Sequence, residues 1–165
     1  MTLTTHIFIA VAATKPIAGA HPGLIFAVAI ASHYLADLIP HWDYRIRSLI
    51  QGEQPQEEHW SPHGHSLRND ILRGGSDFFV GSLLALLLMR TQPEFNLWWF
   101  ATAVIGGVLP DALKALYELL GRPKFLTAIK TTDALLHTKI RLGPYPLIGI
   151  PLQLAILVAA VIVII

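Results

Sequence analysis

The residues with the clearest potential for chemistry lie at the end of an apolar run, in the segment ASHYLADLIPHWDY at positions 31–44. His33 and Asp37 are four residues apart, so on a helix they share one face, and His41 follows four residues later. Imidazole and carboxylate at this spacing are ordinary ligands for zinc, iron or manganese. Such a pair also forms simple hydrogen bonds in many helices, so the surrounding elements must decide between the two interpretations.

The composition predicts a protein that lies in a lipid bilayer. Hydrophobic residues make up 53% of the 165 residues and charged residues only 14%, and the mean hydropathy is +0.54. The chain has no cysteine, so any metal must be held by nitrogen and oxygen ligands. The net charge of +1 gives no electrostatic reason to expect nucleic acid as a partner.

Five apolar stretches predict an all-α fold, a multi-spanning transmembrane bundle of about five helices in a single domain, residues 1–165. Crossing the hydrocarbon core takes roughly 20 residues of helix. The second and fifth stretches reach this length alone, whereas the others need flanking polar residues to complete it. The five stretches are 1–14, 16–36, 78–89, 95–110 and 143–165.

Two more polar regions connect these stretches. Segment 45–70 is rich in Pro, Gly, Gln and Glu, which predicts a loop on the cytoplasmic side. The fourth helix is expected to continue to Gly121, with Pro123 just beyond. Segment 124–143 predicts an amphipathic helix along the membrane surface. The loop also carries three histidines, which could deliver or sense metal or simply be solvated. These are His59, His63 and His65.

Basic residues predict the orientation of the bundle. If all five stretches cross the membrane, ten Lys and Arg residues fall on one side and only Lys15 and Arg90 on the other. Cytoplasmic segments carry the excess of Lys and Arg, so we expect a cytoplasmic N-terminus and an external C-terminus in the cell (inner) membrane. The first basic residue follows the apolar stretch, so the N-terminal segment is expected to be retained rather than cleaved.

This orientation gathers most of the unusual polar residues at one membrane face, which favours a metal site over isolated hydrogen bonds. Asp43 and Asp77 are the predicted catalytic residues, because a site with spare carboxylates can use one as a general base. Asp43 could equally be a solvated loop acid, and Asp111 a helix cap. The predicted metal ligands are His6, His33, Asp37, His41, Asp111 and His137.

These residues resemble a known family, the predicted membrane-bound metal-dependent hydrolases, which are similar in pattern to zinc-dependent phospholipase C and the P1-type nucleases. The family's helix-borne His-x-x-x-Asp and following His match His33, Asp37 and His41. An early His matches His6. A Leu-Pro-Asp at a helix end matches residues 109–111, and a Thr-His-Ser element is partly matched by GHSL at 64–67.

The resemblance implies hydrolysis of an ester or phosphoester with one or two zinc ions, or Mn²⁺ or Fe²⁺, and a lipid-like or small phosphoester as substrate. The N-terminal tryptophan ligand of the soluble enzymes has no counterpart in this chain, which limits the expected number of ions. A transporter that passes a metal cation or protons is the main alternative, and a non-catalytic membrane scaffold is the third. A transporter would place polar groups at several depths, whereas here they gather at one end.

Overall fold

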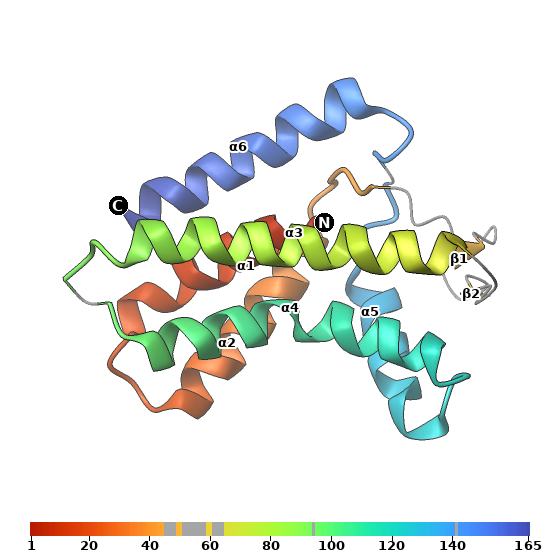
Figure 1. Ribbon diagram of the computed structural model, residues 1–165, viewed down its shortest axis with the longest axis horizontal. Coiled ribbons are helices and arrows are strands. Elements are labelled where there is room, and N and C mark those ends of the chain that lie inside the picture. Colours follow the sequence, from red (N-terminus) through yellow and green to blue (C-terminus); the bar gives the residue numbers. More distant parts are fainter. Residues whose placement is uncertain (45–48, 51–58, 61–64, 94, 141) are drawn as a thin grey trace.

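The computed structural model describes residues 1–44, 49–50, 59–60, 65–93, 95–140 and 142–165, and this part of the chain is almost entirely helical (Figure 1). The prediction of an all-α fold is confirmed. The α-helices are α1 (Leu3–Thr14), α2 (Pro22–Asp37), α3 (His65–Met89), α4 (Leu97–Leu119), α5 (Thr127–Leu136) and α6 (Pro146–Ile164). The described residues also form short elements, which are the 3-10 turns η1 (Lys15–Ile17) and η3 (Lys124–Leu126) and the antiparallel strands β1 (Leu49–Ile50) and β2 (His59–Trp60).

Helix α1 lies at the centre of the bundle, where it packs against α2, α3, α4 and α6. Its apolar side chains, among them Ile7 and Val11, belong to a core that α2, α3, α4 and α6 also line. At the start of α1 the packing becomes polar, because Gln153 of α6 donates to the hydroxyls of Thr2 (2.7 Å) and Thr5 (3.1 Å). The first turn of α1 is therefore held in place by the last helix.

Helix α4 approaches α1 and α2 very closely through a pair of glycines. A Cβ at Gly107 would lie 2.6 Å from the Cβ of Ala10 and 3.2 Å from the carbonyl oxygen of His6. A Cβ at Gly106 would lie 2.7 Å from the Cβ of Ala29. Small residues at such positions let helix backbones approach in a membrane bundle. The contact sets Asp111, one turn beyond Gly107, beside the start of α1.

Three helical segments are long and apolar enough to cross a membrane: Leu67–Met89, Leu97–Leu119 and Pro146–Ile164. Helices α1 and α2 are apolar but shorter, with 12 and 16 residues. At a rise of 1.5 Å per residue they extend about 18 and 24 Å, whereas the hydrocarbon core is roughly 30 Å thick. The predicted count of five membrane helices is therefore not established by helix length.

The boundaries of two predicted segments were wrong. The stretch 16–36 is not one helix, because the chain first turns through η1 and α2 begins only at Pro22. Proline is pre-organised for a first helical position, and the His21 Nδ1 caps this end by accepting from Gly23 N–H (3.1 Å). The segment 45–70 is not all loop, because α3 begins at His65 and extends well before its apolar part.

The chain beyond Pro110 follows the prediction only as far as Gly121. Helix α4 continues through Pro110, and Gly121 follows its end with a φ of +72°, a conformation that glycine adopts without strain. The predicted amphipathic helix over 124–143 was too long, because α5 ends at Leu136. There the chain turns toward α2, and the Thr138 N–H donates to the Asp37 carbonyl oxygen (2.7 Å).

Replacing Gly107 by alanine should destabilise the bundle by about 1–3 kcal/mol, because the added methyl group overlaps α1. Thermal unfolding of the detergent-solubilised protein, followed by circular dichroism, measures the change. Gly75→Ala is the matched control: a Cβ at this helical position meets nothing within 4 Å, so stability should rise by about 0.5–1 kcal/mol. Equal effects of the two substitutions would contradict the proposed α1–α4 contact.

Candidate metal centre

Three imidazoles surround the carboxylate of Asp37 where α2 ends and α1 begins. The Nε2 atoms of His6 and His33 lie 3.2 and 3.3 Å from its two oxygens, and that of His41 lies 3.8 Å away. All four side chains are buried. The rings of His6 and His33 stack with their centroids 3.9 Å apart. Two helices thus present parallel imidazoles to one carboxylate.

Backbone carbonyl groups orient two of these rings. The His33 Nδ1 lies 2.8 Å from the Gly107 carbonyl oxygen, and the His41 Nδ1 lies 2.7 Å from that of Ile39. A carbonyl oxygen only accepts, so each Nδ1 carries a proton, and in a neutral ring the Nε2 atom then has a free lone pair beside Asp37. Metal-ligating histidines are held in this way by a hydrogen bond from the second ring nitrogen.

The Nε2 atoms themselves are the strongest sign of a cation site. Those of His6, His33 and His41 are buried and have no hydrogen-bond partner. A buried polar atom without a partner costs about 1–3 kcal/mol, and here three of them face a carboxylate. A metal ion accepts lone pairs from both nitrogen and oxygen, so these donors fit a metal that prefers imidazole and carboxylate.

The structure brings all six predicted metal ligands together. Asp111 lies with its carboxylate oxygens 3.9 Å from His6 Nε2 and 4.0 Å from His33 Nε2, and the ring of His137 lies 5.0 Å from that of His41. Around Asp37 the donors form three overlapping groups, each with its ligand atoms within 4.8 Å of one another. They are His6, His33 and Asp37; Asp37, His41 and His137; and His33, Asp37, Asp111 and Asp133.

Asp43 lies on the accessible side of this centre. Its side chain is 48% exposed and that of Asp111 is 29% exposed, whereas those of the three imidazoles are 0–1% exposed. Its Oδ2 lies 3.2 Å from His41 Nε2. Desolvation opposes ionisation, but the nearby α-amino group of Met1 and His41 hold the pKa of Asp43 below its usual range. The centre therefore opens toward an ionised carboxylate.

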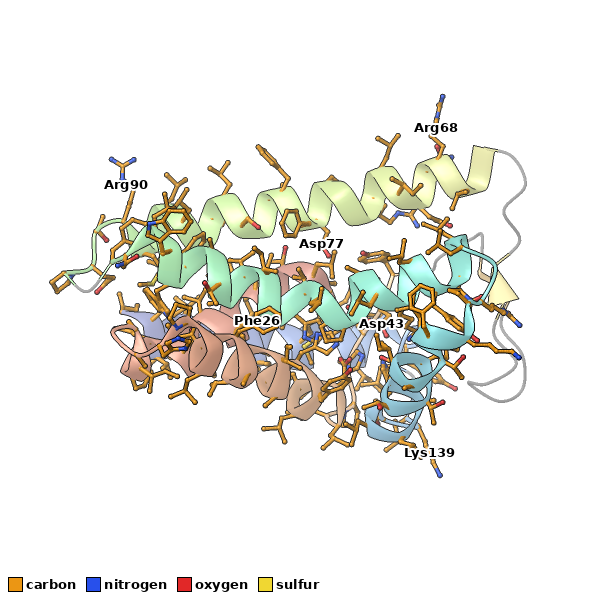
Figure 2. All side chains as sticks on the ribbon, turned by 90° about the horizontal axis from the view of Figure 1, so that it is seen from below. Phe26, Asp43, Arg68, Asp77, Arg90 and Lys139 are labelled. Atoms are coloured by element: carbon orange, nitrogen blue, oxygen red, sulfur yellow. The ribbon has the colours of Figure 1, made fainter. Side chains whose placement is uncertain are left out.

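Asp77 has a different set of contacts. It accepts hydrogen bonds from the Leu3 N–H (2.7 Å), the Thr4 N–H (3.2 Å) and the Thr4 hydroxyl (2.6 Å). The N-cap residue of α1, Thr2, makes no capping bond with its own side chain, so Asp77 of α3 satisfies the free N–H groups there and its charge suits the helix dipole. Figure 2 shows Asp77 between α3 and the start of α1. These contacts support a structural role, and the catalytic role stays a prediction.

Sequence reasoning missed two residues near the centre. Asp133 of α5 is buried, joins the third donor group and lies 2.7 Å from Lys114 Nζ. Its neighbours along the chain suggest a solvated helix face, so only the three-dimensional arrangement identifies it. Burial, together with Asp77, Asp111 and Asp43, raises the pKa of Tyr44, which keeps its phenol protonated beside the open side. The side chains of His59, His63 and His65 lie outside the described residues.

The chain matches no protein-family model, no curated protein and no solved structure. The interpretation of the centre therefore depends on its own geometry. That geometry consists of a buried carboxylate, imidazoles with free lone pairs and an accessible edge of further carboxylates.

Replacing Asp77 by alanine should lower the free energy of unfolding by about 1–3 kcal/mol, because the first turn of α1 loses a charged acceptor. Asp77→Asn should cost less, since asparagine also accepts hydrogen bonds at a helix start. Denaturant unfolding of the detergent-solubilised protein measures both. If the asparagine variant unfolds like the original but loses all hydrolytic activity, Asp77 acts in the chemistry and not as a cap.

Proposed function

We propose that this protein is a membrane-embedded, metal-dependent hydrolase that cleaves an ester or phosphoester at the cytoplasmic face of the membrane. One observation carries the proposal: three buried Nε2 atoms without hydrogen-bond partners converge on Asp37, next to the half-exposed Asp43. In a purely structural cluster each Nε2 would carry a proton and donate it to a neighbouring carboxylate, whereas the neutral rings of His33 and His41 carry their proton on Nδ1.

Zinc is the proposed metal, because two imidazoles and a carboxylate are its usual ligands. His6, His33 and Asp37 would hold one ion, and His41 and His137 would hold a second through the shared Asp37. When bound, zinc supplies Lewis acidity toward a phosphoryl or acyl oxygen and makes a water molecule more acidic. The carbonyl oxygen of Gly107 keeps the His33 ring in the orientation that this ligation requires.

Asp43 is the proposed general base. It is ionised, it lies at the exposed edge of the centre, and its Oδ2 contacts His41 Nε2. A carboxylate in this place can take a proton from the attacking water and pass it to the leaving group. Tyr44, the next residue, keeps its proton and can donate a hydrogen bond to charge that develops on the substrate.

A lipid-like phosphoester is the proposed substrate class. The residues that follow Asp37 along the chain, Leu38 and Ile39, are 49% and 42% exposed, and Leu35 is 64% exposed. Exposed apolar side chains around a polar centre suit an interface between lipid and water. The family resemblance points to phosphoesters as well.

The membrane placement that we propose keeps all five apolar segments in the bilayer, with α1 and α2 completed by polar ends and local thinning. In Figure 1, α1, α3 and α6 end on one side of the molecule, where α2 and α4 begin. Lys15 lies there and donates to the Ile164 carbonyl oxygen (2.7 Å). Figure 2 shows Arg90 at this end of α3, whereas Arg68 and Lys139 lie toward the other end.

The transport alternative fits the described packing less well. Between the metal centre and the end that carries Arg90, the helices enclose an apolar core. A path for cations or protons would need polar groups or water at several depths. This core includes Ile7, Phe8, Val11, Ile25, Met89, Trp99, Phe100 and Val104.

A screen of carboxylic and phosphoric esters, including phospholipids in mixed micelles, should find an activity that chelators remove and zinc restores. His33→Ala and Asp43→Asn should lower kcat/KM by about 100-fold or more, and His33→Ala should also lower the bound zinc. His21→Ala is the control, because His21 lies at the opposite end of α2. Cation flux in liposomes that His33→Ala abolishes, without hydrolysis of any ester, would favour the transporter.

Single cysteines can test the proposed orientation, since the chain has none of its own. Arg90→Cys should react with a membrane-impermeant maleimide in intact cells, because the charge bias places this end of α3 outside. Arg68→Cys should react only after the membrane is permeabilised. Reaction of both from the same side, or the reverse pattern, would contradict the orientation.

A further inference from the structure

Three carboxylates from three different helices converge beside the imidazoles. Asp37 belongs to α2, Asp111 to α4 and Asp133 to α5, and one oxygen of each lies within 4.8 Å of the others. Carboxylates at this separation repel one another strongly when they are withdrawn from water. Proteins keep such groups together when a cation lies between them.

Asp133 provides an independent sign of a cation site. Its side chain is only 5% exposed, and Lys114 Nζ contacts its Oδ2 at 2.7 Å. The other oxygen, Oδ1, is buried and has no hydrogen-bond partner. The lysine therefore accounts for one oxygen of Asp133 and leaves the second without a partner, in a side chain that joins the third donor group. It also supplies one positive charge near three carboxylates.

The imidazole in this group cannot serve two ions. The Nδ1–H of His33 donates a hydrogen bond to the Gly107 carbonyl oxygen, so only the Nε2 lone pair is free. One lone pair binds one metal ion. If zinc binds the Nε2 lone pair of His33, the donors that remain in the group of His33, Asp37, Asp111 and Asp133 are all carboxylate oxygens. Oxygen donors of this kind favour hard cations such as Mn²⁺ and Mg²⁺ over zinc.

We propose that Asp37, Asp111 and Asp133 form an additional, oxygen-rich metal position that takes Mn²⁺ or Mg²⁺. It lies beside the two imidazole positions and shares Asp37 with them. The proposal rests on the proposed function only in assigning His33 to zinc. A cation at this position connects α5 to α2 and α4, so α5 becomes part of the metal centre.

A role for Asp133 as a simple partner of Lys114 is the competing explanation. It accounts for the 2.7 Å contact but not for the unpaired, buried Oδ1. The two explanations differ in what Lys114 does. In a plain ion pair Lys114 stabilises the negative charge of Asp133. Beside a metal position, its positive charge competes with the cation for that carboxylate.

The test is a titration of the purified, zinc-loaded protein with Mn²⁺, in which electron paramagnetic resonance measures the free ion. The original protein should bind one additional Mn²⁺, and Asp133→Asn should weaken this binding by about tenfold or more. Lys114→Met should leave the binding unchanged or tighten it. Glu118→Gln is the matched control, because it removes the buried partner of Lys130 and so another α4–α5 ion pair (2.7 Å) away from the carboxylates.

Zinc content, hydrolysis and thermal unfolding are measured on the same samples, so that the two proposals fail separately. Loss of Mn²⁺ binding in Asp133→Asn with zinc retained supports the oxygen-rich position. Equal Mn²⁺ binding in the original and Asp133→Asn overturns it, as does weaker binding in Lys114→Met, or loss of zinc together with Mn²⁺ in Asp133→Asn. If no zinc binds but Mn²⁺ binding still depends on Asp133, the oxygen-rich position stands and the zinc hydrolase does not.

Discussion

The buried carboxylate of Asp37 is the constraint on which the rest of the structure depends. A carboxylate withdrawn from water is strongly disfavoured unless cations or hydrogen-bond donors surround it. In this protein the groups that surround it come from separate parts of the chain: His6 from α1, His33 and His41 from the region around α2, and the α-amino group of Met1, which lies 3.5 Å from Asp37 Oδ1. Asp111 of α4 lies beside His6 and His33. The close approach of helices through glycines is what brings these groups within reach.

Contacts at the start of α1 and at the end of α2 position the centre. The start of α1 is fixed by acceptors and donors from α3 and α6, so His6 in its second turn has a defined position. The end of α2 is fixed by the Thr138 N–H, which binds the carbonyl oxygen of Asp37 itself. A metal centre tolerates errors of only a few tenths of an ångström in its ligands, so these contacts matter as much as the ligands themselves.

Much of this arrangement could be predicted from the sequence. Apolar runs and their flanking charges indicate the helices, and the Lys and Arg bias alone predicts that His6, Asp37 and Asp111 lie at one end of the bundle. The start of α2 could not be placed well, because residues 16–21 carry no formal charge that would separate them from the apolar helix that follows. The pairing of Asp77 with Leu3 and Thr4 spans more than 70 residues, and no local pattern carries such a contact.

Asp133 illustrates the same limit at the centre. In the segment KTTDALL its position agrees with a polar face in water, and helical periodicity cannot distinguish that face from one turned toward another helix. Only the crossing of α5 with α2 and α4 distinguishes the two. Proximity among the predicted ligands could thus be inferred from topology, whereas Asp133 could be identified as a candidate ligand only from the packing.

The contact between Gln153 and Thr2 has a consequence for how the protein is made. Helix α1 leaves the ribosome first and α6 follows more than 130 residues later. Chains acquire structure progressively during synthesis, so the hydroxyls of Thr2 and Thr5 are made long before this partner. The amide of Gln153 reaches them only when α6 has been made and packed. The packing around the start of α1, the helix that carries His6, is therefore completed only late in synthesis.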